Sequence, residues 1–118
     1  MENKLSIGVD IVSIERIRDI LISPRRNRFL ARVFSSKEIE EALSKYSEAQ
    51  FFAGRFAAKE AFKKASSNNS FIPSISFKSI EIFNNKSGKP EIKAPNCKNI
   101  DLSISHDGNY AIAFCVSS

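Results

Sequence analysis

Two acidic residues, Asp10 and Glu60, lie in surroundings that are otherwise apolar. Asp10 is flanked by Val9 and Ile11 in a run that alternates like a β-strand, and Glu60 lies beside a stripe of small residues with helical period. A partly desolvated carboxylate needs a hydrogen-bond donor, a cation or a metal ion. An Asp and a Glu brought together would repel each other, and an oxygen-only pair favours a hard ion such as Mg²⁺, which usually meets phosphate.

Each of these acids also has a simpler explanation. Asp10 could cap the helix that follows its strand, and Glu60 could pair with Lys64 one helical turn further on. Such arrangements are common, so the residue pattern alone does not decide between these two interpretations and a metal site.

Basic residues surround Glu60 in the sequence and recur in a predicted turn. A polyphosphate ligand would suit this set, because lysine and arginine bind phosphate oxygens. The set comprises Arg55, Lys59, Lys63, Lys64 and the turn Gly88-Lys89-Pro90.

His106 is the single histidine and lies between Ser105 and Asp107 at a predicted strand end. Its neighbours resemble a hydrolytic triad in type, but adjacent residues on a strand point in opposite directions and do not converge. A phosphate contact suits the imidazole better. An exposed turn residue without a role is the remaining interpretation.

The net charge of +5 is concentrated in one segment, residues 16–34, while the charges elsewhere cancel. This concentration favours a docking face for an acidic partner, which could be nucleic acid, anionic lipid or an acidic protein. A solvated arginine-rich helix face is the alternative. The segment contains one acid, Asp19, against Arg16, Arg18, Arg25, Arg26, Arg28 and Arg32.

The beginning of the chain predicts a strand and then a helix. Residues 7–12 alternate with the period of a strand that has one buried face. Ser13 is a suitable N-cap for a helix, which ends at Ser23-Pro24 because the residue before proline resists helical angles. Arginines then line the connection to the next element.

Two capping boxes predict the remaining helices. Ser35 with Glu38 begins a short helix through about Lys45, and Ser47 with Gln50 begins the longest helix, to about residue 65. Small residues cover a broad side of this long helix, so another element can approach it closely. Its phenylalanines are expected to fill the core elsewhere.

The rest of the chain predicts strands. Residues 75–83 alternate with a slip at Ser79-Ile80 that suggests a bulge, and residues 84–90 form a turn to a returning strand, 90–94. A final pair of strands is joined across residues 106–109. The order of elements predicts a single α+β domain over 1–118, with helices packed on one face of a largely antiparallel sheet.

Composition restricts the class of protein. The chain has 118 residues, 42% hydrophobic and 26% charged, which is typical of one globular domain and disfavours a disordered chain. No apolar run is long enough for a transmembrane helix, and no signal-peptide pattern opens the chain, so a cytoplasmic location is expected. Cys97 and Cys115 are too few for a disulfide framework, and Cys115 is expected to be buried as a free thiol.

Five blocks of this sequence, in the right order, resemble the holo-acyl-carrier-protein synthases, the small bacterial type of 4′-phosphopantetheinyl transferase. The most diagnostic block is Phe52-Ala53-Gly54-Arg55-Phe56-Ala57-Ala58-Lys59-Glu60-Ala61. The others are Gly8-Val9-Asp10-Ile11-Val12 with Arg16-Ile17, Arg32-Val33-Phe34-Ser35 with Glu38, Gly88-Lys89-Pro90, and Ser103-Ile104-Ser105-His106 with Tyr110-Ala111.

The resemblance implies a role for each matching residue. Asp10 and Glu60 would be the magnesium ligands, with Glu60 and Lys64 as the catalytic pair. The phosphates and the pantetheine arm of coenzyme A would lie near Lys64, Arg55, His106, Gly88, Lys89 and Pro90. An acidic acyl carrier protein would dock on Arg16, Ile20, Arg25, Arg28 and Arg32.

The resemblance also implies a reaction and an assembly. Magnesium would bridge the pyrophosphate of coenzyme A while a serine of the carrier protein attacks the phosphorus that bears pantetheine. Family members form homotrimers with active sites between subunits, and they work in fatty-acid synthesis without nucleic acid or a membrane. The chain departs from the family at residues 66–70, where relatives have a glycine-rich segment and this sequence has none.

Two rival functions stay open. A non-catalytic or degenerate scaffold would fold and assemble without transferring the group, as the missing glycines suggest. A nucleic-acid-binding module would use the same arginines on phosphate, although no recognised binding motif is present.

Overall fold

The computed structural model describes residues 5–66, 75–95, 97 and 99–118. The segment 67–70, in which the family's glycines are missing, lies outside the described residues. In chain order the elements are β1 Ser6–Ser13, α1 Ile14–Leu21, α2 Arg26–Val33, α3 Ser36–Ala42, α4 Glu48–Ala65, the 3₁₀ turn η2 Phe77–Ser79, β2 Glu81–Asn84, β3 Pro90–Lys93, β4 Ile100–Asp107 and β5 Tyr110–Ser117.

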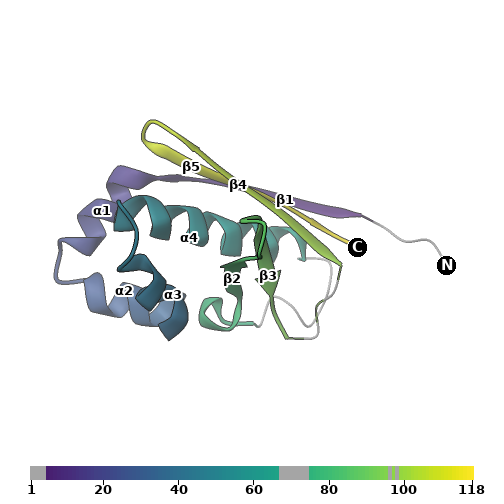
Figure 1. Cartoon of the computed structure of the whole chain (residues 1–118), viewed down its shortest axis with the longest axis horizontal. Coiled ribbons are helices and arrows are strands. Elements are labelled where there is room, and N and C mark those ends of the chain that lie inside the picture. The colour runs from purple at the N-terminus through teal and green to yellow at the C-terminus, as the bar shows by residue number, and fades with distance from the viewer. Residues whose placement is uncertain (1–4, 67–74, 96, 98) are drawn as a thin grey trace.

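The strands form two antiparallel sheets. A three-stranded sheet has the order β1-β5-β4, and β2 pairs with β3 in a separate hairpin. The long helix α4 lies along one face of the larger sheet, with the shorter helices and the hairpin on the same side (Figure 1). The predicted α+β class, with helices on one face and one long helix, is therefore confirmed.

Side-chain caps begin three helices where the sequence predicts them. Ser13 accepts a hydrogen bond from the Arg16 amide, and Ser47 accepts one from the Gln50 amide. At α3 the capping box is complete, because Ser35 bonds the Glu38 amide and the Glu38 carboxylate bonds the Ser35 amide. Each cap satisfies amides at a helix start that have no intrahelical partner.

Helix α2 replaces the arginine-lined connection that the sequence predicts. Its N-cap, Arg25, makes no side-chain hydrogen bond, so the segment carries no capping signal. Leu30 and Val33 are buried on one side, and burial of this apolar side stabilises the helix more than local propensity does.

The strand expected over residues 75–83 is shorter than predicted. Residues 77–79 form the 3₁₀ turn η2, with the Ile80 amide bonded to the Phe77 carbonyl, and only residues from Glu81 onward pair as a strand. The expected bulge at Ser79-Ile80 is therefore wrong. The slip in alternation marks a turn that redirects the chain before β2.

The face of β1 that packs on α4 carries Gly8 and Val12. A Cβ atom at Gly8 would collide with the carbonyl oxygen of Ala61, so glycine is what lets the strand lie directly on the small-residue side of α4. Ile7, Val9 and Ile11 lie on the opposite face and are exposed. In this chain the more hydrophobic side of the strand is thus the outer one.

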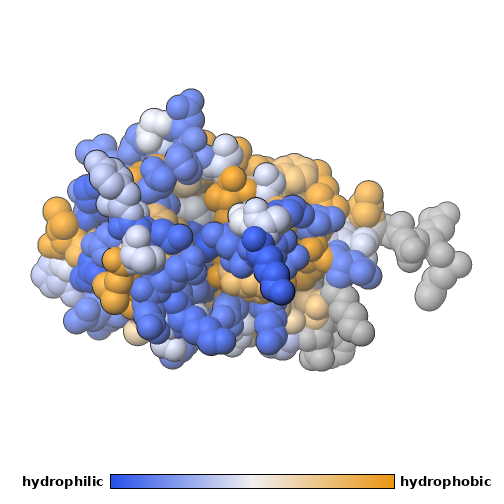
Figure 2. Space-filling model, viewed as in Figure 1, coloured by the Kyte–Doolittle hydropathy of each residue, from blue (hydrophilic) through white to orange (hydrophobic). Residues whose placement is uncertain are grey.

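The exposed face of β1 continues onto β5. In the register of the two strands, Val9 is opposite Phe114 and Ile11 is opposite Ile112. The apolar side chains of this face remain accessible on the side of the sheet away from α4, and Figure 2 shows apolar groups along the edge of the sheet in the same view. We call this surface the outer sheet face; it comprises Ile7, Val9, Ile11, Tyr110, Ile112 and Phe114.

No helix in the described part of the chain is both long enough and apolar enough to cross a membrane. Cys115 is buried as expected, and Cys97 is partly exposed.

Candidate functional site

Asp10, Glu60 and Lys64 line one pocket of about 450 Å³. Asp10 comes from the inner face of β1, whereas Glu60 and Lys64 lie one turn apart on α4, whose close packing against β1 brings the groups together. Arg16 from α1 lines the same pocket. The structure therefore brings together the two acids and the lysine that the sequence predicts as site residues.

The simpler explanations of the two acids are both wrong. The Lys64 ammonium donates to Asp10 Oδ1 at 3.1 Å and to the Val9 carbonyl at 3.0 Å, so its ionic partner is Asp10 rather than Glu60. Helix α1 is capped by Ser13 and not by Asp10. Within the described residues, Glu60 takes part in no ion pair.

The donor set of this pocket fits magnesium. Two carboxylates face a common space, and the described residues contain no cluster of three or more metal-binding side chains that would favour a fully protein-ligated ion. Magnesium is usually held by one or two carboxylates and keeps its other positions for water and substrate phosphate. Asp10 and Glu60 are the residues that would hold it.

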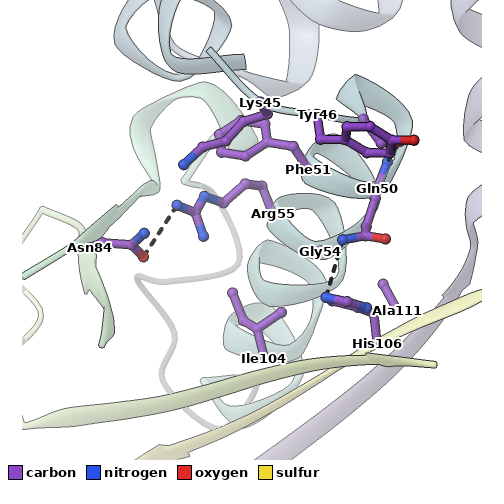
Figure 3. Close-up of a pocket in the computed structure, with 11 residues that line it drawn as sticks. Lys45, Tyr46, Gln50, Phe51, Gly54, Arg55, Asn84, Ile104, His106 and Ala111 are labelled. Atoms are coloured by element: carbon purple, nitrogen blue, oxygen red, sulfur yellow. Dashed lines mark hydrogen bonds between the residues drawn. The ribbon is translucent and has the colours of Figure 1, made fainter. Parts of the chain in front are cut away.

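Arg55 and His106 lie in a second pocket, of about 240 Å³, which shares no lining residue with the first (Figure 3). The Arg55 side chain is buried, and this burial lowers its pKa. The carboxylates of Glu41 and Glu38 offset the lowering only in part. Its Nη2 lies 3.4 Å from the Asn84 Oδ1 atom, and its guanidinium stacks on the Phe51 ring at 4.7 Å.

The cation of Arg55 is incompletely satisfied. Its Nε has no hydrogen-bond partner among the described residues, and the nearest carboxylate oxygen, on Glu41, is 3.5 Å from Nη2. An arginine in this condition is a suitable site for an anion, because a bound phosphate adds charge-assisted hydrogen bonds. Lys45 contributes a second cation at the pocket.

His106 belongs to β4 and not to the turn that follows it. Its Nε2 lies 3.1 Å from the Gln50 Nε2, across the same pocket (Figure 3). Gln50 therefore uses its side chain on His106, and the capping box predicted with Ser47 has only its serine half. The imidazole is exposed, and the Gln50 side chain is its polar partner.

The Gly88-Lys89-Pro90 turn lines neither of these two pockets. Gly88 has a φ of +89°, which glycine adopts without strain, and the Asn85 carboxamide oxygen accepts the Ser87 and Lys89 amides. Lys89 pairs with Asp101 at 3.2 Å. The turn adjoins the second pocket indirectly, because Pro90 is the strand partner of Asn84.

Four of the five predicted docking residues line a third pocket, of about 310 Å³. Arg25, Arg28 and Arg32 line it together with an apolar floor. Arg16 lies in the neighbouring carboxylate pocket instead, and Ile20 is common to both pockets. The floor consists of Ile20, Phe29, Val33, Phe56 and Phe77.

Several lining residues escape sequence reasoning. Phe77 and Asn84 enter the pockets through contacts that are distant along the chain, and nothing in the local pattern marks them. Lys45 and Tyr46 precede the cap of α4 without a motif of their own. The arginine pocket does have a local signal, since its rim is the run of charge in residues 16–34.

Comparisons with known proteins show the family to which this chain belongs. Residues 6–115 match the model of the 4′-phosphopantetheinyl transferase superfamily. The holo-[acyl-carrier-protein] synthase of Anaplasma marginale (strain St. Maries) is 44% identical over 117 residues, covering 95% of this chain and 96% of the relative. The enzyme of the same name from Wolbachia pipientis wMel is 45% identical over 116 residues, with coverage of 94% and 91%.

Solved structures show the same likeness. A holo-(acyl-carrier-protein) synthase from Bacillus anthracis, in complex with CoA (3′,5′-ADP), superposes with a TM-score of 0.81 at 34% identity, covering 95% of this chain and 94% of that one. The Helicobacter pylori synthase in complex with coenzyme A has a TM-score of 0.80 at 34% identity, with coverage of 95% and 99%.

The chain therefore belongs to the 4′-phosphopantetheinyl transferase superfamily. Within it, the chain is a transferase of the holo-[acyl-carrier-protein] synthase type.

Proposed function

We propose that this enzyme transfers the 4′-phosphopantetheine group of coenzyme A to a serine of apo acyl carrier protein in a magnesium-dependent reaction and releases adenosine 3′,5′-bisphosphate. The observation that carries the proposal is the convergence of Asp10, Glu60 and Lys64 on one pocket beside an arginine-rimmed surface. The names of the relatives support the substrate, as do the complexes of two solved relatives with coenzyme A.

Asp10 and Glu60 would hold the magnesium ion, which when bound neutralises charge on the pyrophosphate. The serine oxygen forms a bond to the phosphorus that bears pantetheine as the bond from that phosphorus to the bisphosphate leaving group breaks. We assign acceptance of the serine proton to the Glu60 carboxylate. The Lys64 ammonium, which Asp10 and the Val9 carbonyl orient, stabilises negative charge on the transferring phosphoryl group.

The arginine pocket is suited to an acidic carrier protein. Arg25, Arg28 and Arg32 supply positive charge around an apolar floor, so a helix with acidic residues and an apolar side chain would fit it. Ile20 lies in both this pocket and the carboxylate pocket, so a protein docked on the arginines has its contact surface beside Glu60. We therefore retain Arg16, Ile20, Arg25, Arg28 and Arg32 as the docking residues.

The second pocket would bind other phosphates of coenzyme A through Arg55 and His106, with Gly88, Lys89 and Pro90 beside it. Because this pocket is separate from the carboxylate pocket within one chain, we propose that the complete site forms between copies in a homotrimer. The outer sheet face supplies an exposed apolar surface for that association. As the resemblance implies, the enzyme would work in fatty-acid synthesis in the cytoplasm.

Mass spectrometry of an apo acyl carrier protein incubated with coenzyme A and Mg²⁺ tests the proposal. We expect a mass increase of one phosphopantetheine on a serine, abolished by a chelator and restored by added Mg²⁺. An unchanged carrier mass would support the scaffold alternative. An unchanged carrier mass together with binding of nucleic acid by this protein would support a nucleic-acid-binding module. Either result overturns the proposed function.

A further inference from the structure

A fully buried lysine lies next to Glu60 in sequence and on a different side of α4. The Lys59 ammonium has no exposure to solvent and donates to three oxygens: Glu38 Oε1 at 2.6 Å, the Val33 carbonyl at 2.7 Å and the Phe77 carbonyl at 3.0 Å. All three hydrogens of the ammonium therefore have an acceptor. The lysine has no free position with which to bind a substrate, so its role must be exerted through these contacts.

Glu38 is equally buried and equally satisfied. One carboxylate oxygen accepts the Lys59 ammonium and the Ser35 amide, and the other accepts the Ile82 amide at 3.0 Å. Through this carboxylate, the ion pair is attached to the start of α3 and to strand β2. A buried pair with every hydrogen bond formed fixes the geometry of the groups around it.

The two carbonyls on Lys59 belong to the walls of the arginine pocket. Val33 is the last residue of α2, the helix that carries Arg28 and Arg32, and Phe77 is the first residue of η2. Both residues line the pocket. A single ammonium on α4 thus bonds the backbones of two neighbouring elements that line the arginine pocket.

The same helix carries the reacting end of the site. Glu60 is the residue after Lys59, and Phe56 lines both the carboxylate pocket and the arginine pocket. The distance from the docking arginines to Glu60 is therefore set by how α2 and η2 are attached to α4. Lys59 makes the direct hydrogen bonds from α4 to both of these elements.

We propose that Lys59, with Glu38 as its ionic partner, is a positioning residue that sets the arginine pocket in register with Glu60, so that a docked carrier protein presents its serine to the phosphate site. This inference rests on the proposed function. Group transfer depends on alignment, and a displacement of about 1 Å that originates far from the chemistry can cost about a hundredfold in rate. Apolar packing alone is less directional than three hydrogen bonds from one ammonium.

The test compares Lys59→Met with the double variant Lys59→Met, Glu38→Gln, which leaves no unpaired buried charge. Lys37→Met, on the exposed surface of α3, is the matched control. Circular dichroism selects a temperature at which each protein is folded. Calorimetry then gives the dissociation constant for coenzyme A, and steady-state kinetics give kcat and the KM for the carrier protein.

For both Lys59 variants we expect the dissociation constant for coenzyme A to stay within about twofold, while kcat/KM for the carrier protein falls by about tenfold to a hundredfold. A purely structural role would lower both properties in parallel as the folded fraction falls. Unchanged carrier kinetics in the folded double variant, or a parallel loss of coenzyme A binding, would overturn the inference. Failure of the unmodified enzyme to transfer the group would instead overturn the proposed function.

Discussion

The Lys64 ammonium lies 3.1 Å from the Asp10 carboxylate, a contact between residues 54 positions apart in the chain. This ion pair joins the last turn of α4 to β1 and leaves Glu60, one turn earlier, without an ionic partner in the described part of the chain. Asp10 therefore has a cationic partner within the protein, whereas Glu60, which lines the same pocket, has none among the described residues. This difference suits a site in which Lys64 orients Asp10 and both carboxylates remain at the pocket.

Replacement of Glu60 by Gln is expected to reduce kcat/KM for transfer by at least about a hundredfold, because it removes both a magnesium ligand and the proton acceptor. The melting temperature should change little, since Glu60 makes no ion pair among the described residues. Glu40→Gln, an exposed acid on α3, is the control for loss of one charge. Normal transfer by a Glu60→Gln enzyme that still binds magnesium would contradict the site.

Charge reversal at Arg28 should weaken docking of the carrier protein without affecting coenzyme A. Arg28 lines the arginine pocket, and opposite charge at that position repels an acidic partner. We expect the KM for the carrier to rise about tenfold at low salt, with a smaller difference at high salt because ions screen the contact. Lys37→Glu makes the same charge change on α3 and should behave like the unmodified enzyme; equal effects of the two variants would exclude a specific docking surface.

Ile112→Asp should break the assembly. Ile112 is exposed and lies opposite Ile11 on the outer sheet face, so a charge there would be desolvated in an interface between copies. Light scattering on a size-exclusion column should show a smaller species, and transfer should be lost with it. Leu43→Asp replaces another exposed apolar residue, directly after α3 and outside the outer sheet face, and should leave the mass of the assembly unchanged.

A mixing experiment tests whether the active site lies between subunits. Glu60→Gln inactivates the carboxylate pocket and Arg55→Ala the second pocket, and each variant alone should transfer poorly. If the copies exchange, a mixture should recover part of the activity, because some interfaces then combine two intact halves. A mixture as inactive as its components, with exchange verified by mass spectrometry of differently tagged copies, would place both halves in one subunit.

Gly8→Ala should be strongly destabilising. The added methyl group would collide with the Ala61 carbonyl and approach the Ala65 amide nitrogen to 2.6 Å, so β1 must move away from α4. We expect a loss of about 3 kcal/mol, the upper end of the usual cost of overpacking, in the free energy of unfolding measured by chemical denaturation. Gly54→Ala meets only the Ile104 side chain at 3.2 Å and gains helix propensity, so it should stay near the unmodified value.

Ionisation of the buried Cys115 thiol should lower the free energy of unfolding in alkaline solution. Burial, and to a smaller extent the charge of Asp101, raises the pKa of its thiol from 9.0 to about 11. Between these pH values the unfolded chain releases the thiol proton and the folded chain keeps it. The contribution of this group to the free energy of unfolding is therefore full below pH 9 and declines by about 1.4 kcal/mol per pH unit up to pH 11. Denaturation of Cys115→Ala over the same range should show a correspondingly shallower decline, and equal slopes would exclude this cause.

Local chemistry determined much of the fold in advance. The serines at positions 13, 35 and 47 begin the helices that follow them, because a hydroxyl near a helix start bonds amides that are close in sequence. The charge concentrated around Arg28 likewise predicts a docking surface from the sequence alone, and three of its arginines line one pocket. Helix α2 carries no capping signal in the sequence and is stabilised by burial of Leu30 and Val33, whereas the turn η2 has no buried residue and is bonded to α4 through the Phe77 carbonyl and Lys59.

Tertiary structure alone decided the pairing within the site. The sequence placed Lys64 within reach of Glu60, but the close packing of Gly8 on α4 brings Asp10 to that lysine instead. The same packing left Ile7, Val9 and Ile11 outside, and the fold placed Arg55 and His106 in a different pocket from the carboxylates. Residue types and short spacings specify which groups can do chemistry, whereas contacts between distant segments, set by volume and backbone approach, specify which of those groups meet.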